Sequence, residues 1–332
     1  MIISLLLSSK LLLSDIYTFS TDNDIVFNSD NGYTAALFFA WMGDEYKQAE
    51  KDSFTYYYTS TLSNLVNYLP YVSLDGKKLN ASISLQEMIV TPTDLNSTEP
   101  NTDDVAYSGT LGLHFSIYAW DAQEFDQFRI STGVVGPLSG AEQIQTYIHK
   151  ITGSTEPKGW DNQLDNHFVL NFGYLKGYKS YTKKLGSNVR LEWFNSGFAD
   201  FGNYYVGAGG GTLLRLGQNM PYNFDTLSAL MSATSTNQIN FQSRNNKLGW
   251  AISMGVYANY IAYLYNIEAN KKNGIKKDIS EITNAKVLTA KVSINLFYEN
   301  LETSFEIYPT RTEYDSSNAA SWGRINFTWY FD

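Results

Sequence analysis

Hydrophobic and polar residues alternate with a period of two along most of the chain after residue 15. In the last segment, Ile325, Phe327, Trp329 and Phe331 alternate with Arg324 and other neighbours. Roughly twelve runs share the pattern, each about ten residues long, which is the length of a tilted strand that crosses a bilayer. They cover residues 15–26, 33–43, 81–91, 107–120, 125–134, 165–178, 187–198, 203–216, 247–267, 285–298, 301–313 and 321–331. The pattern predicts an all-β fold: a transmembrane antiparallel β-barrel of about twelve strands.

An even number of antiparallel strands can close on itself and leave no unpaired edge in lipid. Soluble β-proteins favour shorter strands of about five or six residues. Aromatic residues near the predicted strand ends are expected to form girdles at the membrane interfaces. They are Tyr118, Trp120, Trp193, Tyr204, Tyr205, Trp250, Tyr298, Trp322 and Trp329. Gly209-Gly210-Gly211 lies inside a run and is expected to allow close packing.

The connecting segments are polar and are expected to be exposed loops. They cover residues 43–54, 92–106, 217–246 and 268–284. No internal repeat is present, so residues 15–332 are expected to form one outer-membrane barrel domain. Residues 1–14 form a short apolar segment that Lys10 interrupts, and the segment is too short to span a bilayer as a helix. They are interpreted as the remnant of a signal peptide.

Composition narrows the possible functions. Of 332 residues, 43% are hydrophobic and 17% are charged, and the formal net charge is −9. A negative chain lacks the basic field that binds nucleic acid. Because the chain has no cysteine, disulfide scaffolds, thiolate zinc sites and a cysteine nucleophile are excluded.

One segment breaks the alternation and predicts a short helix in an extracellular loop. After Gly136-Pro137, residues 141–151 have helical spacing, with Ser139 or Gly140 as cap and Gly153 as the stop. Gln145 and His149 are four residues apart and therefore share one face of this helix. The other two histidines, His114 and His167, are expected to be structural, with His114 pointing into the lumen.

A second polar cluster begins at the end of the first predicted strand. Asp22-Asn23-Asp24 precedes Asp30-Asn31-Gly32, and the next strand begins at Tyr33-Thr34. Asp, Asn and Gly are the residues of a hairpin connection. Carboxylate and amide oxygens are equally the ligands of Ca²⁺. The residues alone leave both interpretations open.

Together, these segments resemble the lipid A 3′-O-deacylase family of outer-membrane barrels. The most specific match is Gly133-Val134-Val135-Gly136-Pro137, then Gln145 and His149, then Gly159-Trp160-Asp161-Asn162-Gln163-Leu164. Asn23-Asp24 followed by Tyr33-Thr34 is a second match. The resemblance extends from about residue 16 to the C-terminus.

The resemblance implies a Ca²⁺-dependent carboxylic ester hydrolase in the bacterial outer membrane that removes the 3′-linked acyloxyacyl group of lipid A. It implies that His149 is the general base, because an imidazole titrates near neutral pH. It also implies that Asn23 and Asp24 hold the Ca²⁺ ion and that Thr34 and Gln145 complete the site. The expected partners are lipopolysaccharide and membrane lipids, with no nucleic acid, and the chain is expected to be monomeric.

Some family features are absent or shifted. Relatives can place a lysine just after the Thr91-Pro92 segment, where this chain has Asp94-Leu95-Asn96-Ser97. Glu156 has a shifted spacing and is left without a role. The main alternative is a passive barrel, a pore or scaffold with a degenerate site. A phospholipase would share the reaction but not the motifs.

Overall fold

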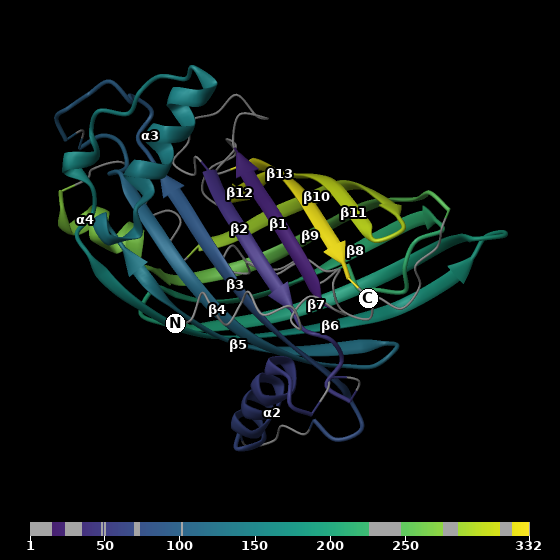
Figure 1. The fold of residues 1–332 in the computed structure, drawn as a ribbon. Helices are drawn as coiled ribbons and strands as arrows, with labels where there is room; N and C mark the ends of the chain where they lie inside the picture. The colour runs from purple at the N-terminus through teal and green to yellow at the C-terminus, as the bar shows by residue number, and fades with distance from the viewer. Residues whose placement is uncertain are drawn as a thin grey trace.

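The strands form a closed antiparallel β-barrel (Figure 1). It is seen in a computed structural model, which describes residues 15–23, 35–47, 49, 51–69, 74–100, 102–225, 247–274, 285–312 and 321–331. The strands are β1 (Ile16–Asn23), β2 (Ala35–Met42), β3 (Lys78–Val90), β4 (Ser108–Trp120), β5 (Glu124–Val135), β6 (His167–Lys184), β7 (Val189–Gly202), β8 (Tyr205–Gln218), β9 (Gly249–Leu264), β10 (Ala285–Tyr298), β11 (Leu301–Tyr308), β12 (Thr310–Thr312) and β13 (Trp322–Tyr330).

β11 and β12 occupy a single position in the wall. Both pair with β10, and Pro309 separates them, because proline has no N–H to donate to the ladder. The wall described by the structure therefore has twelve strand positions. β1 pairs with β2 on one side and with β13 on the other, which closes the ring. The predicted fold class and strand number are confirmed.

Side chains alternate between the lumen and the outer surface, as the sequence pattern predicts. On β1, for example, Thr18, Ser20 and Asp22 are buried in the lumen, whereas Phe19 is exposed on the outside. Large apolar side chains cover the outer surface around the wall. They include Phe39, Leu85, Phe172, Leu214, Met254, Leu296 and Phe305.

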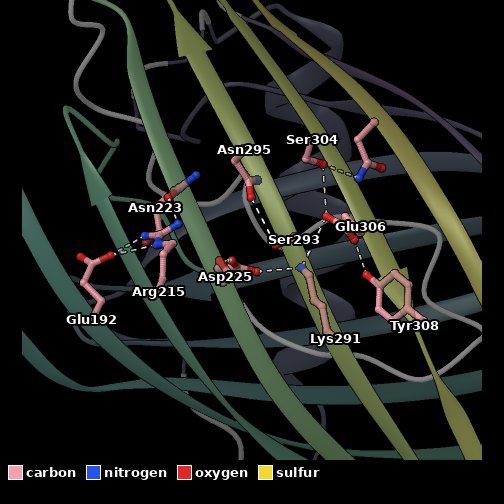
Figure 2. Close-up of polar contacts among 12 residues, drawn as sticks. Glu192, Arg215, Asn223, Asp225, Lys291, Ser293, Asn295, Ser304, Glu306 and Tyr308 are labelled. Atoms are coloured by element: carbon pink, nitrogen blue, oxygen red, sulfur yellow. Dashed lines mark hydrogen bonds and ion pairs between the residues drawn. The ribbon is translucent and has the colours of Figure 1, made fainter.

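The lumen is filled by buried ion pairs and aromatic rings. Figure 2 shows the ion pairs that cross it from β7 to β11. The Arg215 guanidinium donates to Glu192 at 2.6 Å, and the Lys291 ammonium lies 3.0 Å from Asp225 and 3.4 Å from Glu306. Further along the wall, Arg324 pairs with Asp22 and Arg129 pairs with Asp200. Among the described residues, these ion pairs and rings fill much of the interior, as side chains do in barrels of moderate strand number.

Residues 219–225, which follow β8, fold into the lumen instead of forming part of an exposed loop. Met220, Asn223, Phe224 and Asp225 are almost completely buried. Arg190 donates to the carbonyl oxygens of Met220 and Pro221, and Arg215 donates to Asn223. The expectation of an exposed loop across residues 217–246 is therefore wrong for this part, because cations on the wall pair with it. Residues 226–246 lie outside the described residues.

The described helices lie at different rims of the barrel. β1, β3 and β5 end at one rim, together with helices α3 (Ala141–Thr152) and α4 (Tyr265–Lys272), whereas α2 (Phe54–Asn67) lies at the other (Figure 1). The turn 203–204 lies at the α3 rim, whereas the α2 rim carries the short turns 121–123, 185–188 and 299–300 together with the longer connections 43–77 and 219–248. Because bacterial barrels have short periplasmic turns, we call this the periplasmic rim and the α3 rim the outer rim.

Helix α2 has no counterpart among the elements that the sequence predicts, where residues 43–54 are expected to be a polar loop. The helix begins after Ser53, whose side chain accepts a hydrogen bond from the Tyr56 N–H. Val66 packs against outward-facing Ile117 and Ala119 of β4, so α2 lies on the outer surface of the wall. None of the described helices is long and apolar enough to cross a membrane.

The predicted aromatic girdle is only partly correct. Trp193, Tyr298 and Trp329 are exposed on the outer surface. Five of the nine rings instead point into the lumen, where each is at most 4% exposed: Tyr118, Trp120, Tyr204, Tyr205 and Trp322. Gly207 leaves space for one of them, because a Cβ there would lie 2.6 Å from the hydroxyl oxygen of Tyr205, and a Cβ on Gly211 in the glycine run would lie 2.5 Å from that of Tyr257. The close packing predicted for the glycine run is confirmed.

Candidate active site

At the outer rim, the strand register places four residues in one transverse row on the outer face of the wall. Asn23, Ala35, Ile89 and Gly109 are consecutive ladder partners across β1, β2, β3 and β4. Ladder partners point to the same side of a sheet, and the lumen-facing Asp22 alternates with this row. With about 4.8 Å between strands, the row is about 14 Å long. Asn23 is exposed at its first position.

The connection between β5 and β6 folds back over the other end of this row. Its first turn, the 3₁₀ helix η2 (Pro137–Ser139), is followed directly by α3. A Cβ on Gly109 would meet the side chains of Ser139 and Ala141 closer than real Cβ atoms approach. The absence of a side chain at Gly109 therefore allows the loop to lie against the wall. We call η2 and α3 together the overhang.

Helix α3 has the ends that the sequence predicts. Gly140 precedes it with φ 80°, and the Ser139 hydroxyl accepts from the Ala141 N–H at 3.2 Å. Glu142 lies in the first turn, where the helix dipole favours an acid. Gly153 ends the helix with φ 72°. The predicted helix over residues 141–151 is confirmed to within one residue.

Gln145 attaches α3 to the segment that follows it. The indole N–H of Trp160 donates to Oε1 of Gln145 at 2.9 Å, and both side chains are buried. The rings of Trp160 and Tyr107 lie 4.9 Å apart, and Ile89 and Ala141 complete this cluster. Burial raises the pKa of Tyr107. The G-W-D-N-Q-L segment therefore anchors the helix, a role that its sequence alone does not reveal.

His149 lies two turns along α3 and is oriented by a backbone carbonyl. Its Nδ1 is hydrogen-bonded to the carbonyl oxygen of Thr155. The left-handed turn at Gly153 brings the chain back over the helix end, where the Ser154 N–H donates to the His149 carbonyl at 3.0 Å. Because a carbonyl can only accept, Nδ1 carries the proton in the neutral ring, and Nε2 keeps its lone pair. His149 is only half-buried, so part of the residue is accessible from outside the protein.

The other residues singled out from the sequence lie in four different places. Asn23 is placed in the row, whereas Asp24 and Thr34 lie outside the described residues. Glu156 is exposed, and the Asp94 carboxylate accepts from the Asn96 N–H at the surface. His114 is hydrogen-bonded in the lumen to Ser131 and Gln86, as expected.

Within the part of the chain that the structure describes, no three His, Asp or Glu side chains gather as a ready metal site. The donors that the sequence offers a hard cation here are the Asn23 amide oxygen and the Asp24 carboxylate. Both are oxygen ligands of the kind that Ca²⁺ takes. The chemistry of this donor set fits Ca²⁺, and a stretch of two residues needs other oxygens to complete the coordination shell.

Replacing Gly109 with alanine is expected to displace the overhang. The new methyl group would overlap Ser139 and Ala141, and overpacking of this kind costs about 1–3 kcal/mol. Limited proteolysis should therefore cut residues 139–159 faster than in the wild type. Gly186→Ala is the matched control, because a Cβ there has no neighbour within 4 Å. Equal cleavage of Gly109→Ala and the control would contradict this placement of the loop.

Comparisons of sequence and structure relate this chain to known proteins. A family model described as "Outer membrane protein LpxR" matches residues 2–331. The solved structure "LpxR from Salmonella typhimurium" matches with a TM-score of 0.70 and 17% sequence identity, over 95% of this chain and 100% of that chain. The β domain of the Bordetella autotransporter BrkA matches with a TM-score of only 0.45 and 8% identity, over 96% and 100% of the two chains. A search of curated protein sequences finds no match.

Proposed function

This chain belongs to the LpxR family of outer-membrane proteins, and from that premise we propose that it is an esterase that hydrolyses the 3′-linked acyloxyacyl ester of lipid A. The observation that carries the proposal is His149, an imidazole oriented through Nδ1 on a helix that overhangs the outer face of the wall. A site on this face at the outer rim is open to lipids of the outer leaflet. A site in the lumen would not be accessible to these lipids.

His149 is the general base of the proposed reaction. Its Nε2 takes a proton from water as the water oxygen attacks the ester carbonyl carbon. When the bond between that carbon and the 3′ oxygen of the sugar breaks, the imidazolium returns the proton to the sugar oxygen. The products are a free carboxylic acid and a 3′ hydroxyl group. In the neutral ring, the hydrogen bond from Nδ1 to the Thr155 carbonyl leaves the Nε2 lone pair for the water proton.

Asn23, Asp24, Thr34 and Gln145 are the other proposed site residues. Asn23 and Asp24 would hold Ca²⁺, which as a Lewis acid stabilises negative charge that develops on the carbonyl oxygen. Gln145 fixes α3 through its Oε1, while its Nε2 is buried without a hydrogen-bond partner among the described residues. We assign to these amide hydrogens, and to the hydroxyl of Thr34, the role of donors to the substrate.

The filled lumen argues against a pore, which is one form of the passive-barrel alternative. The ion pairs of Lys291 and Arg215 and the inward fold of residues 219–225 obstruct the path that a solute would take. A scaffold with a degenerate site would still fit this architecture. The difference between scaffold and enzyme is therefore one of activity, which the following assay measures.

Purified protein in detergent micelles should release the 3′ acyloxyacyl unit from lipid A only when Ca²⁺ is present. Addition of EGTA should stop the release, and excess Ca²⁺ should restore it, because the ion would stabilise charge in the transition state. Mass spectrometry of the lipid product measures both effects. A glycerophospholipid substrate serves as the control and should remain intact. Cleavage that continues in EGTA would contradict the proposed role of Ca²⁺, and cleavage of the phospholipid alone would favour a phospholipase.

A further inference from the structure

Glu87 of β3 is an acid on the outer face of the barrel wall. Its ladder neighbours across the wall are Thr21, Leu37, Leu111, Val134 and Phe168. The other members of this row are apolar or, in one case, a threonine, as suits a surface that faces lipid. A charged residue on this face opposes stable insertion. The barrel wall itself does not require an acidic side chain at this position.

The overhang buries Glu87. The residue is only 5% exposed, whereas Leu85, two residues along the same face, is 45% exposed, and Phe168 in the same row is 62% exposed. The Ser139 hydroxyl on the overhang lies beside the carboxyl group. Among the described residues, however, neither carboxyl oxygen has a hydrogen-bond partner of good geometry. A buried carboxyl group without partners costs free energy that an apolar side chain would not.

The position of Glu87 relates it to the candidate active site. The row of Asn23, Ile89 and Gly109 is the next row toward the outer rim, two residues along each strand. Two strand residues correspond to about 6.6 Å. Glu87 therefore lies one row deeper in the membrane than Asn23, on the side of the hydrocarbon region. The overhang that covers it is the one that carries His149.

We propose that Glu87 is a substrate-binding residue whose carboxyl group accepts a hydrogen bond from an amide N–H or hydroxyl group of the acylated sugar. In an acylated sugar, these polar groups lie between the ring and the hydrocarbon chains, at the depth where Glu87 lies. Docking of the glycolipid supplies the hydrogen bond that the carboxyl group lacks. The residue thereby favours acylated amino sugars over lipids that have no donor at this depth. This inference rests on the proposed function.

The test compares Glu87→Leu with Glu87→Gln. Leucine matches the apolar row and suits the lipid-facing wall, so the fold should be retained. It removes the acceptor, and loss of a hydrogen bond to a buried group should raise the Kd and KM for lipid A about tenfold to a hundredfold, with little change in kcat. Glutamine keeps an acceptor and should remain within about fivefold of the wild type. Thr132→Leu is the matched control, a polar-to-leucine change on the outer face of β5.

Lipid A binding, steady-state kinetics and thermal unfolding should be measured on all four proteins. An unchanged Kd in Glu87→Leu would overturn the proposal. A raised Kd that is accompanied by a lower melting temperature would also overturn it, because the role of Glu87 would then be to hold the overhang. If the wild type binds lipid A but does not cleave it, the proposed esterase function fails while the Kd values still decide the role of Glu87. A wild type that neither binds nor cleaves lipid A contradicts both.

Discussion

Replacing His149 with alanine is expected to lower the rate of lipid A deacylation about 10²–10⁴-fold. That range is the typical contribution of a positioned general base. His149 is half-buried and is not part of the hydrophobic core of the barrel. The variant should therefore fold as the wild type does. Initial rates with purified protein and saturating Ca²⁺ measure the effect, with the same lipid A substrate for each variant.

Lys150→Ala is the matched control for this loss. Lys150 is the next residue on α3 and is exposed, so its removal should leave the rate within about threefold, as expected for a surface change away from the chemistry. A His149→Ala enzyme that retains its full rate would show that another group accepts the proton. An equal loss in both variants would indicate a general effect of the helix surface.

Replacing Lys291 with methionine is expected to destabilise the barrel by about 3–5 kcal/mol, the typical result of removing one partner from a buried ion pair. The Lys291 ammonium lies between Asp225 and Glu306 (Figure 2). Without it, two buried carboxylates face each other, and residues 219–225 lose one of the contacts that hold them in the lumen. Urea unfolding, followed by the heat-modifiable migration of the barrel on gels, measures the change.

Lys286→Met is the matched control for Lys291→Met. It makes the same substitution on the same strand, at an exposed position, and should change the stability by less than about 0.5 kcal/mol. A Lys291→Met barrel as stable as the control would show that the lumen admits water freely enough to solvate both carboxylates. The described packing of the lumen would then be wrong.

Most of the barrel can be predicted from its sequence, because the strands carry their own signal. Alternation reveals each strand and its two faces, and all twelve predicted runs coincide with strand positions of the wall. Helix α3 is also predictable, since Gly140 and Gly153 mark its ends locally. Strand alternation and helix ends depend on residues that are close together in the sequence, so the sequence alone reveals them.

The sequence could not assign aromatic rings to the correct face, nor could it place residues 219–225. Tyr118 and Trp120 occur near a strand end, as girdle residues do, but their parity along β4 directs them inward. Asn223 and Asp225 are polar and resemble loop residues, yet cations from distant strands pair with them in the lumen. Both errors arise from contacts between residues that are far apart in the chain.

For the candidate site, the sequence identified Gln145, His149 and Asn23 but not how they are held. The Nδ1 contact with Thr155, the Trp160 anchor and the cover over Gly109 all depend on how the loop folds back on the wall. Glu87 gave no signal at all, because an acid in an alternating strand could equally have faced a polar lumen. Only the strand register shows that it faces outward.

The most direct test of the account is mass spectrometry of lipid A from outer membranes that contain the wild-type chain, compared with membranes that contain His149→Ala at equal abundance. The account predicts that wild-type membranes lose a mass equal to the 3′ acyloxyacyl unit and that the variant membranes keep it. Lipid A that is intact in both, with folded protein and Ca²⁺ present, would contradict the proposed esterase and leave a passive barrel.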